Sequence, residues 1–168
     1  MLFRSELSFV SSHLQLGHAF ERGAWYLRPL LDGGFTYVNT PGFSESGAGG
    51  ANLMVKSRSE TSWSLEPALE IGAEMKLTGG PVLRPYIKAG LLHFFSGTTP
   101  KVSASFQGAP AGVGGFNISG RTDRNFGDIS LGAEIINLNG ANIKIGYSGQ
   151  FSQRSNSHGG MIKFALPF

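Results

Sequence analysis

The sequence predicts an all-β fold of long antiparallel strands, and three observations carry this prediction. Apolar residues alternate with polar ones over long stretches, no 3.6-residue periodicity is sustained, and the segments between the strands alternate between short and long. A period of two places successive side chains on opposite faces of a strand. The chain is 40 % apolar and has no apolar run of the roughly twenty residues that a transmembrane helix needs.

The segment Ser62–Leu77 is the clearest strand, because it keeps period two over sixteen residues. Strands in soluble globular proteins usually run about five or six residues. Its three glutamates, Glu66, Glu70 and Glu74, share one face. We expect them to repel one another unless basic residues on the next strand, such as Arg84 and Lys88, lie opposite them.

Most of the chain repeats this pattern. The first strand, Leu2–Phe20, is less regular, because its apolar residues change parity, and it predicts a bulge near Ser11–His13. The other predicted strands are Trp25–Val38, Leu83–Leu91, Asp128–Ile135, Asn142–Ser148 and His158–Phe168.

The connections between these strands predict how the strands are arranged. Glu21–Ala24, Thr78–Pro81 and Asn137–Gly140 are short, Asn39–Gly50 and Ser96–Arg124 are long, and Ser152–Ser157 is intermediate. Such alternation is typical of up-and-down barrels in outer membranes, which have tight periplasmic turns and longer outside loops. We therefore predict a single domain over residues 1–168, an antiparallel transmembrane β-barrel that is partial, with about seven or eight long strands. Alternatively, Ser103–Gln107 and Gly114–Ser119 add a hairpin and raise the strand count by two.

In such a barrel the two parities have different surroundings, lipid on one side and a polar, wet interior on the other. For most of the polar residues taken singly, we favour cross-strand pairing of opposite charges over a specific role. The predicted interior-facing residues are Arg28, Asp32, Glu66, Glu70, Glu74, Arg84, Lys88, Asp128, Glu134, Lys144 and Lys163.

Aromatic residues near the strand ends, Tyr26 among them, are candidates for interfacial girdles, with Trp25 beside a short turn and Tyr37 and Phe95 beside long loops. A packing role in a soluble core is the alternative for any single aromatic.

Several kinds of site are not supported. There is no cysteine, and the four histidines lack the spacing of a metal site. The net charge is +3, without the basic stripe with interleaved aromatics that nucleic-acid binding needs. His93 and His158 flank long loops, so an outer-rim hydrolase that uses them with Asp123 or Asp128 is an alternative. We expect no catalytic residues, no metal and no cofactor.

The start of the chain bears on its completeness. Bacterial single-chain barrels almost always have an even number of strands, and a membrane tolerates no open sheet edge. The opening residues MLFRSELSF form a strand pattern and not an export signal. We expect that further strands and such a signal precede Met1.

The strand signatures follow one another in a recognisable order. They read LRPLLDGGFTYV, SLEPALEIGAEMKL, LRPYIKAGLLHFF, FGDISLGAEI, ANIKIGYSGQF and a terminal MIKFALPF. In this order, and in its aromatic last residue, the chain resembles the β-domain of bacterial autotransporters, the type V secretion proteins. The resemblance spans essentially all 168 residues.

The resemblance implies an outer-membrane translocator that exports an N-terminal passenger to the cell surface, with surface loops outside and a periplasmic C-terminus. Its implied partners are outer-membrane lipids, its own upstream passenger and the barrel assembly machinery, but no nucleic acid. In the family that machinery recognises the terminal strand, which assigns the assembly signal here to Phe168, Leu166 and Phe164. Alternatively, Phe168 is only the last apolar residue of an edge strand.

Two other functions fit the same strands. One is a small porin-like or adhesin-like outer-membrane barrel without a passenger. The other is a soluble β-sandwich binding module, in which the apolar parity would face a second sheet. The length of the strands argues against the sandwich, because tilted strands of about ten residues match a bilayer.

Overall fold

The structure, a computed structural model, describes residues 7–138 and 140–166. In this part of the chain every regular element is a β-strand, apart from one 3₁₀ turn, η1 (Gly49–Ala51). The all-β prediction is therefore confirmed. Within the same residues, no helix has the length and apolar character needed to cross a membrane.

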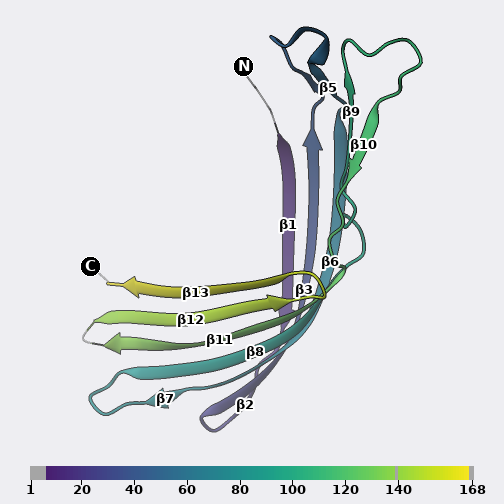
Figure 1. The fold of residues 1–168 in the computed structure, drawn as a ribbon. Coiled ribbons are helices and arrows are strands. Elements are labelled where there is room, and N and C mark those ends of the chain that lie inside the picture. The colour runs from purple at the N-terminus through teal and green to yellow at the C-terminus, as the bar shows by residue number, and fades with distance from the viewer. Residues whose placement is uncertain (1–6, 139, 167–168) are drawn as a thin grey trace. The chain divides into compact units, whose positions relative to one another are not determined.

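The main sheet contains seven long strands, and their order in the sheet is their order along the chain (Figure 1). The short strands β2 (Phe20–Arg22) and β7 (Met75–Lys76) pair with β3 and β8. Antiparallel pairing joins β8 to β11, β11 to β12 and β12 to β13, as an up-and-down arrangement requires. The seven long strands are β1 (Ser8–Gly17), β3 (Trp25–Thr40), β6 (Arg58–Ala73), β8 (Val82–Phe94), β11 (Asn125–Leu138), β12 (Ala141–Phe151) and β13 (Asn156–Ala165).

The three short connections turn tightly because each contains a residue in the left-handed region. Gly23 has φ 63°, Gly79 and Gly80 have φ 95° and 103°, and Asn137 and Gly140 have φ 60° and 85°. Glycine and asparagine tolerate these angles at little cost. The local sequence therefore explains why the chain reverses at these points.

Several strand boundaries differ from the prediction. The strand predicted at Ser62 begins four residues earlier, at Arg58, and it is interrupted at Glu74, whose backbone N–H donates to the Ala24 carbonyl (2.7 Å). Within the predicted range Leu2–Phe20, β1 ends at Gly17, and His18 and Ala19 separate it from β2.

A second, smaller sheet lies within and just after the segments predicted as long loops. Its order is β10-β9-β5-β4, and its pairings are antiparallel. The strands are β4 (Phe43–Ser44), β5 (Leu53–Val55), β9 (Lys101–Phe106) and β10 (Phe116–Ser119). The alternative hairpin at Ser103–Gln107 and Gly114–Ser119 therefore exists as β9–β10, but it belongs to this sheet and adds no long strand to the main one.

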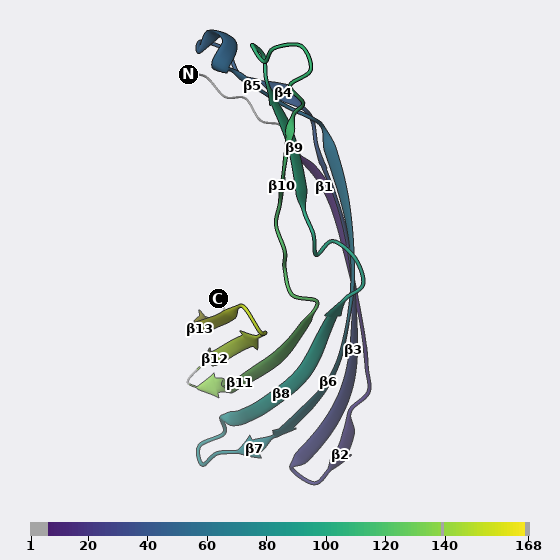
Figure 2. The same ribbon diagram turned by 45° about the vertical axis from the view of Figure 1, so that its right-hand side comes forward.

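The contacts divide the chain into two compact units, each described here by itself. One consists of residues 1–13, 34–64 and 94–122, and it contains the second sheet. The other consists of residues 14–33, 65–93 and 123–168. In this second unit Figure 2 shows β8, β11, β12 and β13 side by side.

Candidate functional site

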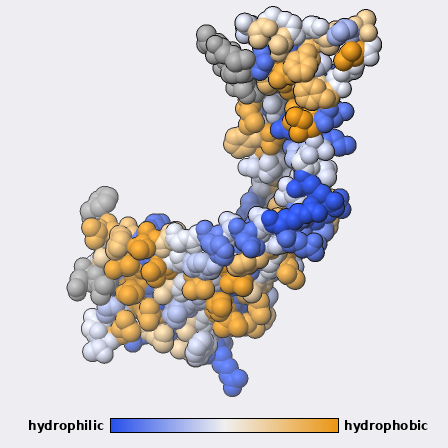
Figure 3. All heavy atoms as spheres, in the orientation of Figure 1, coloured by the Kyte–Doolittle hydropathy of each residue, from blue (hydrophilic) through white to orange (hydrophobic). Residues whose placement is uncertain are grey.

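The apolar side chains that occupy every second position along the strands of the main sheet are exposed. Leu69 and Ile71 on β6 are 44 % and 43 % exposed, and Ile145 on β12 is 54 % exposed. Figure 3 shows apolar residues gathered in broad patches over the lower strands in that view. We call this side of the sheet the apolar face. Its exposed members include Leu27, Leu31, Leu65, Leu69, Ile71, Ile87, Leu91, Ile129, Leu131, Ile145 and Ile162.

The side chains at the positions in between lie on the opposite side of the sheet, which we call the polar face. They are more buried than those of the apolar face. Along β6 every second residue from Ser62 to Glu70 is less exposed than its apolar neighbours, and Glu70 is buried. Buried apolar side chains are few among the described residues, namely Leu30, Ala73, Ala104 and Phe126. A soluble sheet buries its apolar side, so this inverted pattern indicates a sheet with lipid on one face.

Glu70 lies at the centre of one polar cluster. Arg28 Nη2 donates to Glu70 Oε1 at 2.6 Å, and the Tyr26 hydroxyl donates to the same oxygen at 2.8 Å. Below this group, Gly72 leaves room for the Tyr26 ring, because a Cβ at Gly72 would overlap it. The Arg28–Glu70 bond is charge-assisted, which is the stronger kind of hydrogen bond.

Lys88 lies at the centre of a second cluster, which joins four strands. Its Nζ is 2.9 Å from Glu66 Oε1 and 4.0 Å from Asp32 Oδ2. Gln15 Nε2 donates to the other oxygen of Asp32 at 2.8 Å. The side chains of Lys88, Glu66 and Asp32 are 20 %, 14 % and 8 % exposed, so the pairing is well shielded from solvent.

Glu74 also has a basic partner, because Arg84 Nη2 is 2.8 Å from Glu74 Oε2. Lys88 and Arg84 thus contact Glu66 and Glu74, as the sequence predicted. The partner of Glu70 comes instead from β3, the preceding strand.

The remaining predicted interior residues lie on β11, β12 and β13. Asp128 lies opposite Gly90 and Gln150 in the ladders. Glu134 lies between Arg84 and Lys144, and Lys144 lies opposite Lys163. Lys144 Nζ is also 5.7 Å from the centre of the Tyr86 ring, within reach of a cation–π contact.

The predicted assembly signal lies at one edge of the main sheet. β13 is the last strand in the sheet order, and Phe164 and Leu166 are each 70 % exposed. Phe168 lies outside the described residues.

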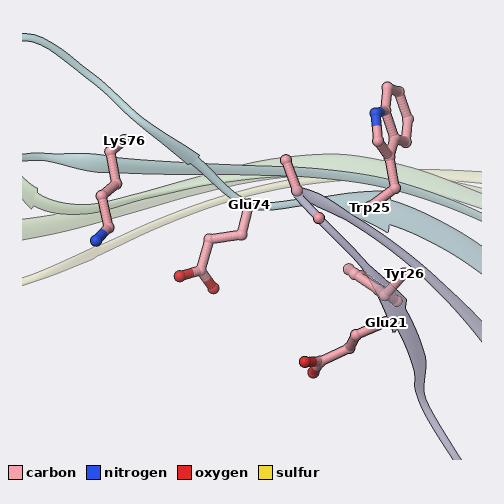
Figure 4. Close-up of a pocket in the computed structure, with 7 residues that line it drawn as sticks. Glu21, Trp25, Tyr26, Glu74 and Lys76 are labelled. Atoms are coloured by element: carbon pink, nitrogen blue, oxygen red, sulfur yellow. The ribbon is translucent and has the colours of Figure 1, made fainter.

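A shallow pocket of about 310 Å³ opens beside the β2–β3 turn. Figure 4 shows Glu21, Tyr26 and Glu74 on one side of the strands and Trp25 on the other. The pocket is lined by Glu21, Gly23, Ala24, Trp25, Tyr26, Glu74 and Lys76, a set that includes no histidine or serine.

The two histidines considered for a hydrolase alternative lie beside an amide oxygen and a hydroxyl group. His93 Nδ1 is 2.6 Å from Asn125 Oδ1, and His158 Nδ1 is 2.7 Å from the Tyr147 hydroxyl. Asp123 accepts a hydrogen bond from the Arg154 backbone N–H. In the described part of the chain, no group of three histidine or acidic side chains is placed to hold a metal ion.

A comparison with protein families decides the identity of this fold. The model of the family described as the autotransporter β-domain matches residues 8–148. This chain belongs to the autotransporter β-domain family. No curated protein matches it. Autotransporter β-domains are translocator barrels of type V secretion in the outer membrane and not a catalytic family, so the resemblance inferred from the strand signatures is confirmed.

Membership gives the two faces of the sheet their physical meaning. The role of this autotransporter β-domain is that of an outer-membrane translocator, associated with a membrane and a passenger domain. An exposed apolar face of this kind is what a strand-built membrane protein presents to lipid. A soluble sandwich would instead have packed that face against a second sheet.

Sequence reasoning missed two members of the polar clusters, Tyr26 and Gln15. The sequence analysis predicts a girdle position for Tyr26, although Tyr26 lies on the same side of its strand as Arg28. The available signal was the glycine at position 72, since a glycine among larger residues on a strand often marks a close approach by another group.

Proposed function

We propose that this β-domain exports an N-terminal passenger polypeptide to the cell surface. The observation that carries the proposal is the polar face, where ion pairs centred on Lys88 and Glu70 line one side of a sheet whose other side is apolar. A surface of closely spaced, paired charges holds water and offers no apolar patch to which a moving unfolded segment would adhere.

We also propose an orientation and a route of assembly. The long connections, which include β9 and β10, face the cell exterior, and the short turns face the periplasm. The terminal strand, through Phe164, Leu166 and Phe168, is the segment that the barrel assembly machinery recognises. The alternation of connection lengths supports the orientation.

These 168 residues contain no cysteine, so a thiol introduced into them and compared with the unsubstituted full-length protein makes the orientation directly testable. Ala111→Cys places a thiol in the β9–β10 connection, and Thr78→Cys is the matched variant in the β7–β8 turn. We expect a membrane-impermeant maleimide to label Ala111→Cys on intact cells and to label Thr78→Cys only after the outer membrane is opened. The reverse pattern would refute the orientation.

Export is tested with an epitope tag on the N-terminal side of the β-domain in the full-length protein. We expect added protease to remove the tag from intact cells when the barrel is in the outer membrane. A tag that stays protected while the barrel is fully inserted would contradict passenger export. That outcome would favour the porin-like alternative.

A further inference from the structure

Five charged residues form a continuous row across the polar face of the second unit. Arg84 pairs with Glu74 at 2.8 Å, and the ladders then place Glu134 opposite Arg84 and Lys144 opposite Glu134. Lys163 on β13 is the last member, opposite Lys144. From Glu74 onward the charges read negative, positive, negative, positive, positive.

The alternation of negative and positive charges ends with Lys144 and Lys163, which are both positive and lie opposite each other. Directly opposed residues of an antiparallel ladder point to the same face, and like charges in such positions destabilise the pair. Lys144 has Glu134 and the Tyr86 ring as neighbours. Lys163 is exposed, and no acidic side chain pairs with it among the described residues. A negative charge beyond Lys163 would restore the alternation.

That missing position falls on a free sheet edge. β12 covers one edge of β13, and no described strand covers the other. Each unpaired backbone group in hydrocarbon costs several kcal/mol, so a membrane sheet needs a partner strand there. The described strand β1 (Ser8–Gly17), at the opposite end of the sheet order, contains no aspartate or glutamate.

We propose that the strand that covers the free edge of β13 carries a carboxylate directly opposite Lys163. Lys144 and Lys163 are then a carboxylate-binding pair that sets the register of the closing strand. A slip of one residue would turn the carboxylate to the lipid side, where a charge is costly. This inference rests on the membrane placement of the β-domain and is independent of passenger export.

The test uses the 168-residue chain, reconstituted in phosphatidylcholine vesicles. The ligands are dye-labelled peptides in which valine and serine alternate. The peptides are about ten residues long, the length of a membrane-spanning strand. One carries a central glutamate on the serine parity, one carries lysine there, and one carries the glutamate one residue further, on the valine parity. Binding is measured by fluorescence anisotropy.

We expect the first peptide to bind about five-fold more tightly than the lysine peptide, and more tightly than the shifted one. Lys163→Glu should reverse the preference between glutamate and lysine, whereas Lys163→Arg should keep it. Lys101→Glu makes the same charge change on β9 and should leave the preference unaltered.

Three results would overturn the proposal. The first is an unchanged preference in Lys163→Glu. The second is equal binding of the shifted peptide, which would mean that a carboxylate binds without strand register. The third is the absence of binding by any of the peptides, because the edge of β13 would then not accept a strand.

Discussion

At the scale of single residues, Lys88 is the basic side chain that lies close to two shielded carboxylates. It is the basic partner of Glu66 and lies 4.0 Å from Asp32, and all three side chains are largely shielded. Removing one member of a shielded charge cluster leaves the others uncompensated, which costs more than the pairing itself contributes.

We therefore expect Lys88→Met to lower the free energy of unfolding by about 1–3 kcal/mol, since it removes the cation beside the shielded carboxylates of Glu66 and Asp32. The measurement is urea unfolding of the reconstituted protein, followed by tryptophan fluorescence. Lys101→Met is the control, because Lys101 is exposed on β9 and lacks this environment. Equal midpoints for Lys88→Met and the wild type would show that the cluster is not stabilising.

Gly72 gives a second prediction at this scale, a steric one. A side chain at Gly72 would overlap the Tyr26 ring and displace its hydroxyl from Glu70. We expect Gly72→Val to reduce the heat-modifiable, folded fraction on gels.

Gly160→Val is the matched control for this change, because a Cβ at Gly160 meets nothing within 4 Å. Adding Tyr26→Ser to Gly72→Val should restore part of the folded fraction by removing the ring. If Gly72→Val and Gly160→Val behave alike, the close fit of Tyr26 over Gly72 is unimportant.

At the scale of a strand, adjacent residues of β12 meet different solvents. Ile145 belongs to the apolar face and Lys144 to the polar face. An arginine on the lipid side near the bilayer centre costs about 2–4 kcal/mol, whereas charge changes on the interior side cost far less.

Ile145→Arg should therefore be much more damaging than Lys144→Glu, although the two positions are neighbours. The readout is the folding equilibrium of each variant in vesicles, measured against urea. Equal tolerance of the two changes would mean that the two faces have been assigned to the wrong solvents.

Strand periodicity predicts which face of the sheet a residue occupies, but it does not predict which residues of neighbouring strands lie opposite each other. Period two separates Leu69 and Ile71 from Glu66 and Glu70 without any structure, because parity alone decides the face. Parity does not give the register between strands, so the Arg28–Glu70 pair was not predicted. Tyr26 was misplaced because an aromatic side chain with a hydroxyl suits both a lipid interface and a polar interior.

At the scale of the whole molecule, the terminal strand is the element on which assembly is expected to depend. Phe164 and Leu166 are exposed on the same parity of the last strand segment. We expect Phe164→Asp with Leu166→Asp, or deletion of Phe168, to remove the full-length protein from the outer membrane. Ala165→Asp, on the opposite parity, should be tolerated better. Normal outer-membrane levels of the double variant, assayed by membrane fractionation, would contradict a signal in this strand.

The second sheet could not have been predicted in full. The β9–β10 hairpin is local and shows as two short alternating runs. The pairing of β5 with β9 joins Leu53 to Phe106, which are far apart in sequence, so it depends on how the long strands bring their ends together. Local patterns contain no information about such pairings.

This second sheet also determines what a ligand or antibody meets on these segments. Asn52 Nδ2 donates to Gln107 Oε1 at 3.0 Å, and the Gln107 backbone N–H donates to the Asn52 carbonyl at 2.9 Å, so two distant stretches of chain form one patch. An antibody raised against the folded protein would recognise a discontinuous epitope there. A linear peptide copied from residues 107–115 would reproduce only half of it, and would make a poor immunogen for the native surface.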